Sequence, residues 1–136
     1  MTTRFAYDKR LDPPAPIVPV RVAGPIGENA ALLRMLVDTG ADCTLVPVHI
    51  VRRLGLPQVD IVGLSGVGGV KQRATVHAAS IGLGGVRVTA RIVAFDDEAI
   101  LGRDVLNQCV MTLDGPGLTI SLQPAPRPRR RLQARR

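Results

Sequence analysis

One acidic residue stands at the point where a buried strand is expected to end. The apolar run of residues 30–37 stops abruptly at Asp38, and Thr39 and Gly40 follow it directly. Glycine allows a tight turn and the close approach of a second backbone, while a threonine hydroxyl can hydrogen-bond locally and fix a loop. The plain interpretation is a strand followed by a turn. The chemical interpretation is a carboxylate held at the end of a strand, where it can act on water.

A carboxylate does hydrolytic work when a second carboxylate lies close enough to share one proton with it. Like charges at that distance do not both ionise easily, so the pair holds one proton over a wide pH range. One member then acts as a base toward water and the other as an acid toward a carbonyl oxygen. The sequence contains a single Asp-Thr-Gly, so the second carboxylate must come from another copy of the chain across a two-fold axis.

Three segments, taken together, resemble the retropepsin-like aspartic proteases. Leu36–Val46 is similar to the catalytic segment of that family, Gly63–Val70 to its glycine-rich flap, and Ala99–Leu106 to its late apolar-apolar-Gly-Arg-Asp segment. The resemblance spans residues 17–122. It implies an all-β, retropepsin-like acid protease barrel with one or two short helices. It also implies a homodimeric aspartic endopeptidase that hydrolyses peptide or protein substrates without a cofactor or metal.

The resemblance further implies roles for the matching residues. Asp38 is expected to be the catalytic carboxylate, Thr39 to hydrogen-bond across the dimer axis, and Gly40 to leave room for the substrate backbone. The residues expected to form the flap or to line the substrate cleft are Val37, Ala41, Gly66, Val67, Gly68, Gly69 and Ile100.

The resemblance also predicts an ion pair that supports the site. An arginine that follows the apolar residues 100–101 must find a partner or reach water. Asp42 is the expected partner of Arg103, and Asp104 is the alternative.

Composition bounds the class of protein. With 136 residues, 46% of them hydrophobic, the chain suits one domain with one core. Two Phe, one Tyr and no Trp leave that core to aliphatic side chains, and 14 Gly and 11 Pro favour short strands and turns. No apolar run is long enough to span a membrane, and the N-terminus has no signal-peptide pattern. We therefore predict a cytoplasmic protein in which Cys43 and Cys109 stay reduced.

The chain divides into a Pro-rich N-terminal arm, extended or disordered, at 1–16, a protease domain at 17–122, and a disordered Arg/Pro-rich tail at 123–136. Strands are predicted at 17–23, 30–37, 43–46, 59–64, 70–83, 86–95, 99–101, 110–113 and 118–122. Short helices are predicted at 47–55 and 102–108, the first because Pro47 suits a first turn. His49 is expected on the surface of the first helix, and His77 is expected to be structural.

Charge gathers at the C-terminal end. The net charge is +7, and six arginines lie in the last ten residues. Such a tail can contact nucleic acid weakly and without specificity, since no stacking aromatic residues accompany it. Two alternatives to the protease stay open: a peptide-binding or dimerisation module that cleaves little, and a nucleic-acid-associated protein acting through the tail. The resemblance implies that the acidic loop Asp96–Glu98 forms a wall of the substrate cleft, so we expect a preference or at least a tolerance for basic side chains beside the scissile bond. The alternative is a solvated turn whose charges point away.

Overall fold

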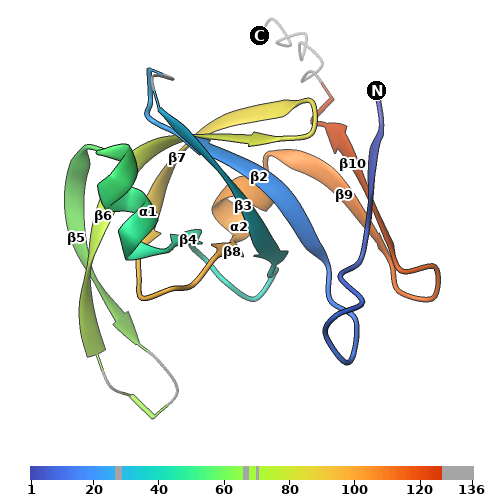
Figure 1. The fold of residues 1–136 in the computed structure, drawn as a ribbon, viewed down its shortest axis with the longest axis horizontal. Helices are drawn as coiled ribbons and strands as arrows, with labels where there is room; N and C mark the ends of the chain where they lie inside the picture. The colour runs from blue at the N-terminus through green and yellow to red at the C-terminus, as the bar shows by residue number, and fades with distance from the viewer. Residues whose placement is uncertain (27–28, 66–67, 70, 127–136) are drawn as a thin grey trace, which may run out of the picture.

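Strands dominate the computed structural model, which describes residues 1–26, 29–65, 68–69 and 71–126 (Figure 1). The strands are β1 (Thr3–Ala6), β2 (Ile17–Ala23), β3 (Ala30–Val37), β4 (Leu45–Val46), β5 (Gln58–Ser65), β6 (Lys71–Leu83), β7 (Val86–Ala94), β8 (Ile100–Leu101), β9 (Cys109–Asp114) and β10 (Thr119–Pro124). The helices are α1 (Val48–Leu54) and α2 (Arg103–Leu106). The predicted all-β class with two short helices is confirmed.

The larger sheet holds most of the core. Its seven strands follow the order β2-β3-β8-β4-β7-β6-β5, and the end of β2 also pairs with β6, which closes part of the sheet on itself. Alternation along β2 explains the packing, because successive side chains of a strand point to opposite faces. Val18, Val20 and Val22 are fully buried, while the residues between them face outward. Aliphatic residues fill this core, as the composition predicts.

A second sheet joins the two ends of the described chain, in the order β1-β10-β9. The segment 1–16, predicted as an extended or disordered arm, pairs through Thr3–Ala6 with Thr119–Leu122 and then turns back between Asp8 and Ala15. The prediction for the last hairpin is confirmed as β9 and β10. However, β10 has a strand on each side, so it has no free edge for a partner subunit.

Helix α1 covers one side of the core through Ile50, Val51 and Leu54. Its end is tied to β6 by His77, whose Nδ1 lies 2.8 Å from the Leu56 carbonyl oxygen and whose Nε2 lies 2.8 Å from Thr75 Oγ1. His77 is buried, so the predicted structural role is confirmed. His49 lies on the exposed face of α1, with Nδ1 3.6 Å from Asp97 Oδ1. In the part of the chain that the structure describes, neither helix is long and apolar enough to cross a membrane.

Some sequence predictions concern residues outside the described ones. They are the flap residues Gly66 and Val67 and the arginine-rich residues 127–136. Residues 123–124, predicted as the start of the tail, belong to β10. The division of the chain at residues 16 and 122 stays a prediction.

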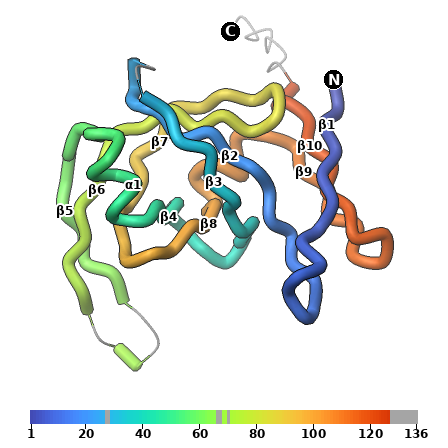
Figure 2. Tube along the Cα trace, viewed as in Figure 1, coloured from blue at the N-terminus to red at the C-terminus, as the bar shows by residue number. Residues whose placement is uncertain are grey.

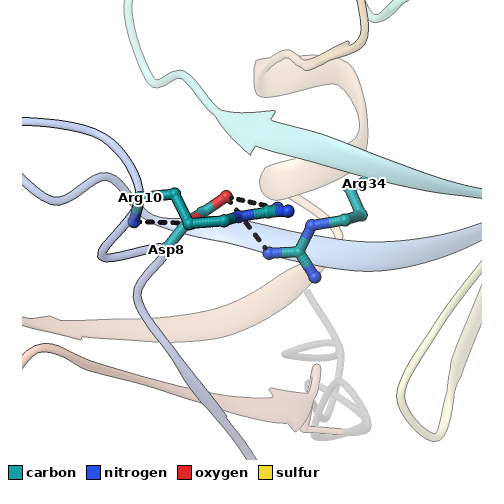
Figure 3. A network of polar contacts seen from close by, with 3 residues as sticks. All are labelled: Asp8, Arg10 and Arg34. Atoms are coloured by element: carbon teal, nitrogen blue, oxygen red, sulfur yellow. Dashed lines mark hydrogen bonds and ion pairs between the residues drawn. The ribbon is translucent and has the colours of Figure 1, made fainter.

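A buried carboxylate anchors the segment between β1 and β2 (Figure 3). Asp8 is 8% exposed. Its Oδ1 accepts hydrogen bonds from Arg10 N and Nε, both at 3.0 Å, and its Oδ2 accepts from Arg10 Nη2 at 2.9 Å and Arg34 Nη2 at 3.4 Å. The hydrogen bonds from Arg10 hold the pKa of Asp8 well below its usual range. Ionised Asp8 thus fixes the N-terminal segment to β3.

Replacing this carboxylate gives a pH-dependent test. Because the pKa of Asp8 is lower in the folded chain, its contribution to stability is present above the unfolded pKa of about 4 and is lost as the pH falls toward the folded value. Asp8→Asn should therefore lower the free energy of unfolding at neutral pH, with a smaller difference from wild type at about pH 3. Urea titrations at both pH values measure this. Asp12→Asn, at an exposed acid of the same segment, is the matched control, and an equal deficit at both pH values would contradict the assignment.

Candidate active site

Strand pairing brings the first and third motifs together. β3 and β8 run parallel, with Leu36 opposite Ile100 and Val37 opposite Leu101. Ile100 also pairs with Leu45 on the strand that leaves the first motif. The residues that follow β3 and β8, Asp38 and Gly102, therefore lie at the same end of neighbouring strands.

The loop 38–41 is fixed from outside by the segment 101–103. The Asp38 amide donates to the Leu101 carbonyl at 3.0 Å, and the Arg103 amide donates to the Ala41 carbonyl at 2.8 Å. The Arg103 guanidinium adds a third bond, from Nη1 to the Thr39 carbonyl at 2.8 Å. These three bonds hold both ends and the middle of a short exposed turn, so its conformation does not depend on a ligand.

Bonds within the loop orient the carboxylate. The Gly40 amide donates to Asp38 Oδ1 at 2.9 Å, and the Ala41 amide donates to the Asp38 carbonyl at 3.2 Å. A Cβ at position 40 would stand 3.2 Å from that same carboxylate oxygen, which is tight for a non-bonded contact. Glycine therefore keeps the Asp38 carboxylate in place and leaves the surface beside it open. The Asp38 side chain is half-buried at this edge.

The predicted partner of Arg103 is wrong within one chain. Among the described residues, the ion pairs do not include Arg103 with either Asp42 or Asp104. Arg103 instead binds the Thr39 carbonyl, because helix α2 begins at Arg103 and carries its side chain toward the loop. Asp42 is exposed next to the loop. The arginine thus supports the site through the backbone and not through a charge pair.

A buried polar network behind the loop was missed by the sequence analysis. Thr44 is fully buried; its hydroxyl donates to Asp104 Oδ1 at 2.7 Å and accepts from the Gly102 amide at 3.1 Å. The Thr44 amide donates a hydrogen bond to Asp104 Oδ2 at 3.3 Å. The network joins the chain after the loop to the start of α2. The sequence signals were a threonine, Thr44, in a predicted apolar strand and an aspartate, Asp104, beside Arg103. Neither is distinctive by itself.

Close packing at Gly102 accounts for the glycine of the third motif. A Cβ there would collide with the backbone of Cys43. Since that obstacle is main chain and not a flexible side chain, the two segments can approach only if position 102 carries no side chain. Gly102 thereby lets the Thr44 hydroxyl reach its amide.

The thiol nearest the site is not a nucleophile. Burial and the neighbouring Asp42 carboxylate raise the pKa of Cys43 to about 11. A thiol with such a pKa stays protonated at neutral pH, whereas the thiolate is the reactive form.

The remaining predicted residues lie at different depths. Val37 is 7% exposed and packs in the main core, so it offers little surface to a substrate, contrary to the prediction that it lines a subsite. Ile100 is half-buried beside the loop. Gly68 and Gly69 lie exposed between β5 and β6 with φ of 93° and 74°, at the tip of the predicted flap. Among the described residues there is no cluster of three or more side chains suited to hold a metal ion.

The chain matches a known protein family over most of its length. The model of the gag-polyprotein putative aspartyl proteases matches residues 25–108, which include the loop 38–41, β8 and α2. The chain belongs to this family. No curated protein sequence matches the chain significantly.

Solved structures agree with this membership. The EIAV protease in complex with the inhibitor HBY-793 is similar over 68% of this chain and 86% of its own, with 28% identity and a TM-score of 0.55. A retropepsin-like aspartic protease from Rickettsia conorii is similar over 90% of this chain and 91% of its own, with 16% identity and a TM-score of 0.58. The second shows the fold alone. The predicted retropepsin-like fold is confirmed.

The buried network gives a test of how the loop is supported. Thr44→Val keeps the side-chain shape but leaves the Gly102 amide without its acceptor, and Asp104 Oδ1 keeps only the hydrogen bond from the Val105 amide. An unsatisfied buried polar group costs about 1–3 kcal/mol, so the free energy of unfolding should fall by that amount in urea titration. Thr89→Val, at an exposed threonine of β7, is the matched control and should change it by less than about 0.5 kcal/mol. Equal effects of the two substitutions would show that the network does not stabilise the fold.

Proposed function

We propose that this protein is an aspartic endopeptidase whose catalytic pair is formed by Asp38 from each of two identical chains. The observation that carries the proposal is the firmly held turn at the end of β3, which presents one carboxylate at an open edge. The turn needs no ligand to adopt this shape, because residues 101–103 bind it at three points. A preorganised carboxylate of this kind suits catalysis, since no energy is then spent on ordering it during the reaction.

The proposed mechanism uses one proton shared by two carboxylates. The ionised member takes a proton from water, which attacks the carbonyl carbon of the scissile peptide bond. The protonated member donates its proton to the carbonyl oxygen, giving a neutral tetrahedral intermediate. The carboxyl that took the proton from water then donates it to the leaving nitrogen as the C–N bond breaks. A hydroxyl proton of the intermediate returns to the other carboxylate, which restores the shared-proton pair. Neither a cofactor nor a metal enters this sequence of steps.

Neighbouring residues take supporting roles in this proposal. The Gly40 amide holds one oxygen of Asp38, so the other oxygen is directed to water and to the partner carboxylate. The Thr39 side chain is exposed at the turn and would hydrogen-bond across the two-fold axis. Substrate would lie extended between the loop and the β5–β6 hairpin, pairing main chain to main chain. Gly66, Val67, Gly68, Gly69, Ala41 and Ile100 are the proposed cleft and flap residues.

Strand β9 is the proposed dimer contact. It is an edge of its sheet, and Met111 and Leu113 lie opposite Leu122 and Ile120 on β10. Directly opposite residues share one face of a sheet. Leu122 and Ile120 are at most 1% exposed, yet Leu113 on the same face is 42% exposed. The core side of β9 is thus only partly covered by its own chain, and a second copy paired along this edge would cover it.

Removal of the carboxylate tests the chemistry. Asp38→Asn is nearly isosteric but cannot share the proton, so hydrolysis of a random peptide library should fall by about 10²- to 10⁴-fold. The unfolding midpoint and peptide affinity should stay close to wild type. Residual activity within about tenfold of wild type would place the catalyst elsewhere. A wild type that binds peptides but hydrolyses none would support the alternative of a binding module with this fold.

Mixing the two proteins tests whether the pair spans two chains. If both carboxylates are needed, activity after exchange with Asp38→Asn should follow the square of the wild-type fraction. Direct proportion to that fraction would show that one chain is sufficient. The control is mixing with a double variant, Asp38→Asn with Leu113→Lys, which should enter dimers less readily and therefore lower the activity less at the same mixing ratio.

The proposed contact has its own test. Leu113→Lys places a charge on the partly covered face of β9 and should raise the dimer dissociation constant at least about tenfold, as measured by sedimentation equilibrium. Thr112→Lys adds the same charge on the opposite face of the same strand and should change it much less. Specific activity should fall on dilution below the dissociation constant in both proteins. Equal dimerisation of the two variants would move the interface away from this face.

A further inference from the structure

The outer face of β2 and β3 carries cations and apolar side chains in alternation. Pro19 pairs with Arg34 across the two strands, and Arg21 pairs with Leu32. All four lie on the face opposite the buried valines of β2. Leu32 is 74% exposed, which is unusual for a leucine in the middle of a sheet. Each strand thus places an apolar residue opposite an arginine of its neighbour.

Two neighbouring hollows make this face into a groove. One of about 610 Å³ lies between the segment that contains Phe5 and Arg10 and the start of β2. The other, of about 480 Å³, lies between Phe5 and the turn that joins β6 to β7. Phe5 and Pro19 line both hollows, so the two are continuous. The chain reverses direction between β1 and β2 (Figure 2), which makes β1 a wall beside the face. We call this feature the outer groove.

The outer groove is strongly cationic. The positively charged residues among its described lining are Lys9, Arg10, Arg21, Arg34 and Arg87. The one acid in that lining is Asp8, and its carboxylate already accepts hydrogen bonds from Arg10 and Arg34 (Figure 3). The lining therefore has an excess of positive charge over its full length.

Two of these arginines flank a bare stretch of backbone. Arg21 lies opposite Gly82 on β6, and Gly82 lies opposite Arg87 on β7. Neighbouring strands are about 4.8 Å apart, so the Cα atoms of Arg21 and Arg87, two strands apart, are separated by roughly 10 Å. Neither arginine forms an ion pair with any residue that the structure describes. Position 82 has no side chain to fill the gap, which leaves room for an acidic group.

We propose that the outer groove binds an extended acidic peptide, a segment of a protein partner in which acidic and apolar side chains are interspersed. Such a segment matches the lining in both respects, since its carboxylates would meet the unpaired arginines and its apolar side chains would cover Leu32 and Pro19. Charge complementarity of this kind sets partner choice and speeds association. The chain's own arginine-rich tail does not fit, because it repeats the sign of the groove.

Nucleic acid is the competing polyanion, and the lining favours it less. Binding of single strands draws on aromatic faces on which bases stack. The two aromatic residues of the groove, Phe5 and Tyr7, are half-buried and pack against the main core, so their rings are not free platforms. The exposed apolar surface here is aliphatic, which suits peptide side chains.

The outer groove is separate from the proposed catalytic loop. None of its described lining residues belongs to 36–42 or to 99–104. Peptide binding there should therefore persist in Asp38→Asn, and a failure of the proposed protease activity would leave this proposal standing.

The test measures binding of a fluorescein-labelled peptide of alternating glutamate and valine by anisotropy, using full-length Asp38→Asn so that the probe is not cleaved. In that background, Arg21→Gln with Arg87→Gln should weaken binding about three- to tenfold, from the loss of two exposed charge contacts. Arg52→Gln with Arg53→Gln removes the same charge from the exposed face of α1 and should leave binding within about twofold. All variants keep the same tail, so its contribution cancels.

Two further measurements complete the test. Leu32→Ser, a change at an exposed position, should weaken the glutamate–valine peptide but not a peptide of alternating glutamate and serine. Equal effects of the two double variants would overturn the proposal, because the binding would then be a response to total charge. It would also be overturned if a labelled oligo-deoxythymidine bound more tightly than the peptide and lost affinity specifically in the Arg21 and Arg87 double variant.

Discussion

The contact on which the candidate site depends is the junction between residues 38–41 and 101–103. Parallel pairing of β3 with β8 sets the two segments side by side, and three hydrogen bonds then fix the turn. Removing a single bond of this kind costs about 1 kcal/mol, but here all three act on four residues. The turn consequently adopts one shape, and the direction of the Asp38 carboxylate follows from that shape.

This junction is itself held from behind. The buried Thr44 hydroxyl bonds the Gly102 amide and one oxygen of Asp104 at once, so the position of α2 depends on a side chain that follows the loop 38–41 in sequence. Gly102 makes the arrangement possible, because any side chain there would meet the backbone of Cys43. The chain after the loop and the start of the helix are thus coupled through one small buried polar cluster.

The sequence was sufficient for features that are local and was insufficient for features set by distant contacts. Strand and helix positions followed from alternation and from turn residues, and β2 and β3 have the predicted bounds. By contrast, pairing of Thr3–Ala6 with β10 joins the two ends of the chain, and proline density around it pointed away from a sheet. Within one chain, Arg103 also bonds a backbone carbonyl and not the predicted carboxylate, because a sequence shows charges but not the carbonyl that a helix start brings within reach. The Asp8 network depends on Arg34, which is 26 positions away.

A single chain has one copy of the Asp38 motif and one partly covered strand edge, and we infer that dimerisation accounts for both features. Asp38 has no second carboxylate of the same motif in its own chain, and Leu113 shares a face with fully buried β10 residues while remaining 42% exposed. An edge strand can pair with a strand of another chain, and a two-fold dimer contains a second copy of Asp38. Association would then cover apolar surface and complete the proposed catalytic pair in one step. Under the proposed function, activity would then depend on concentration, because one chain carries a single copy of the motif.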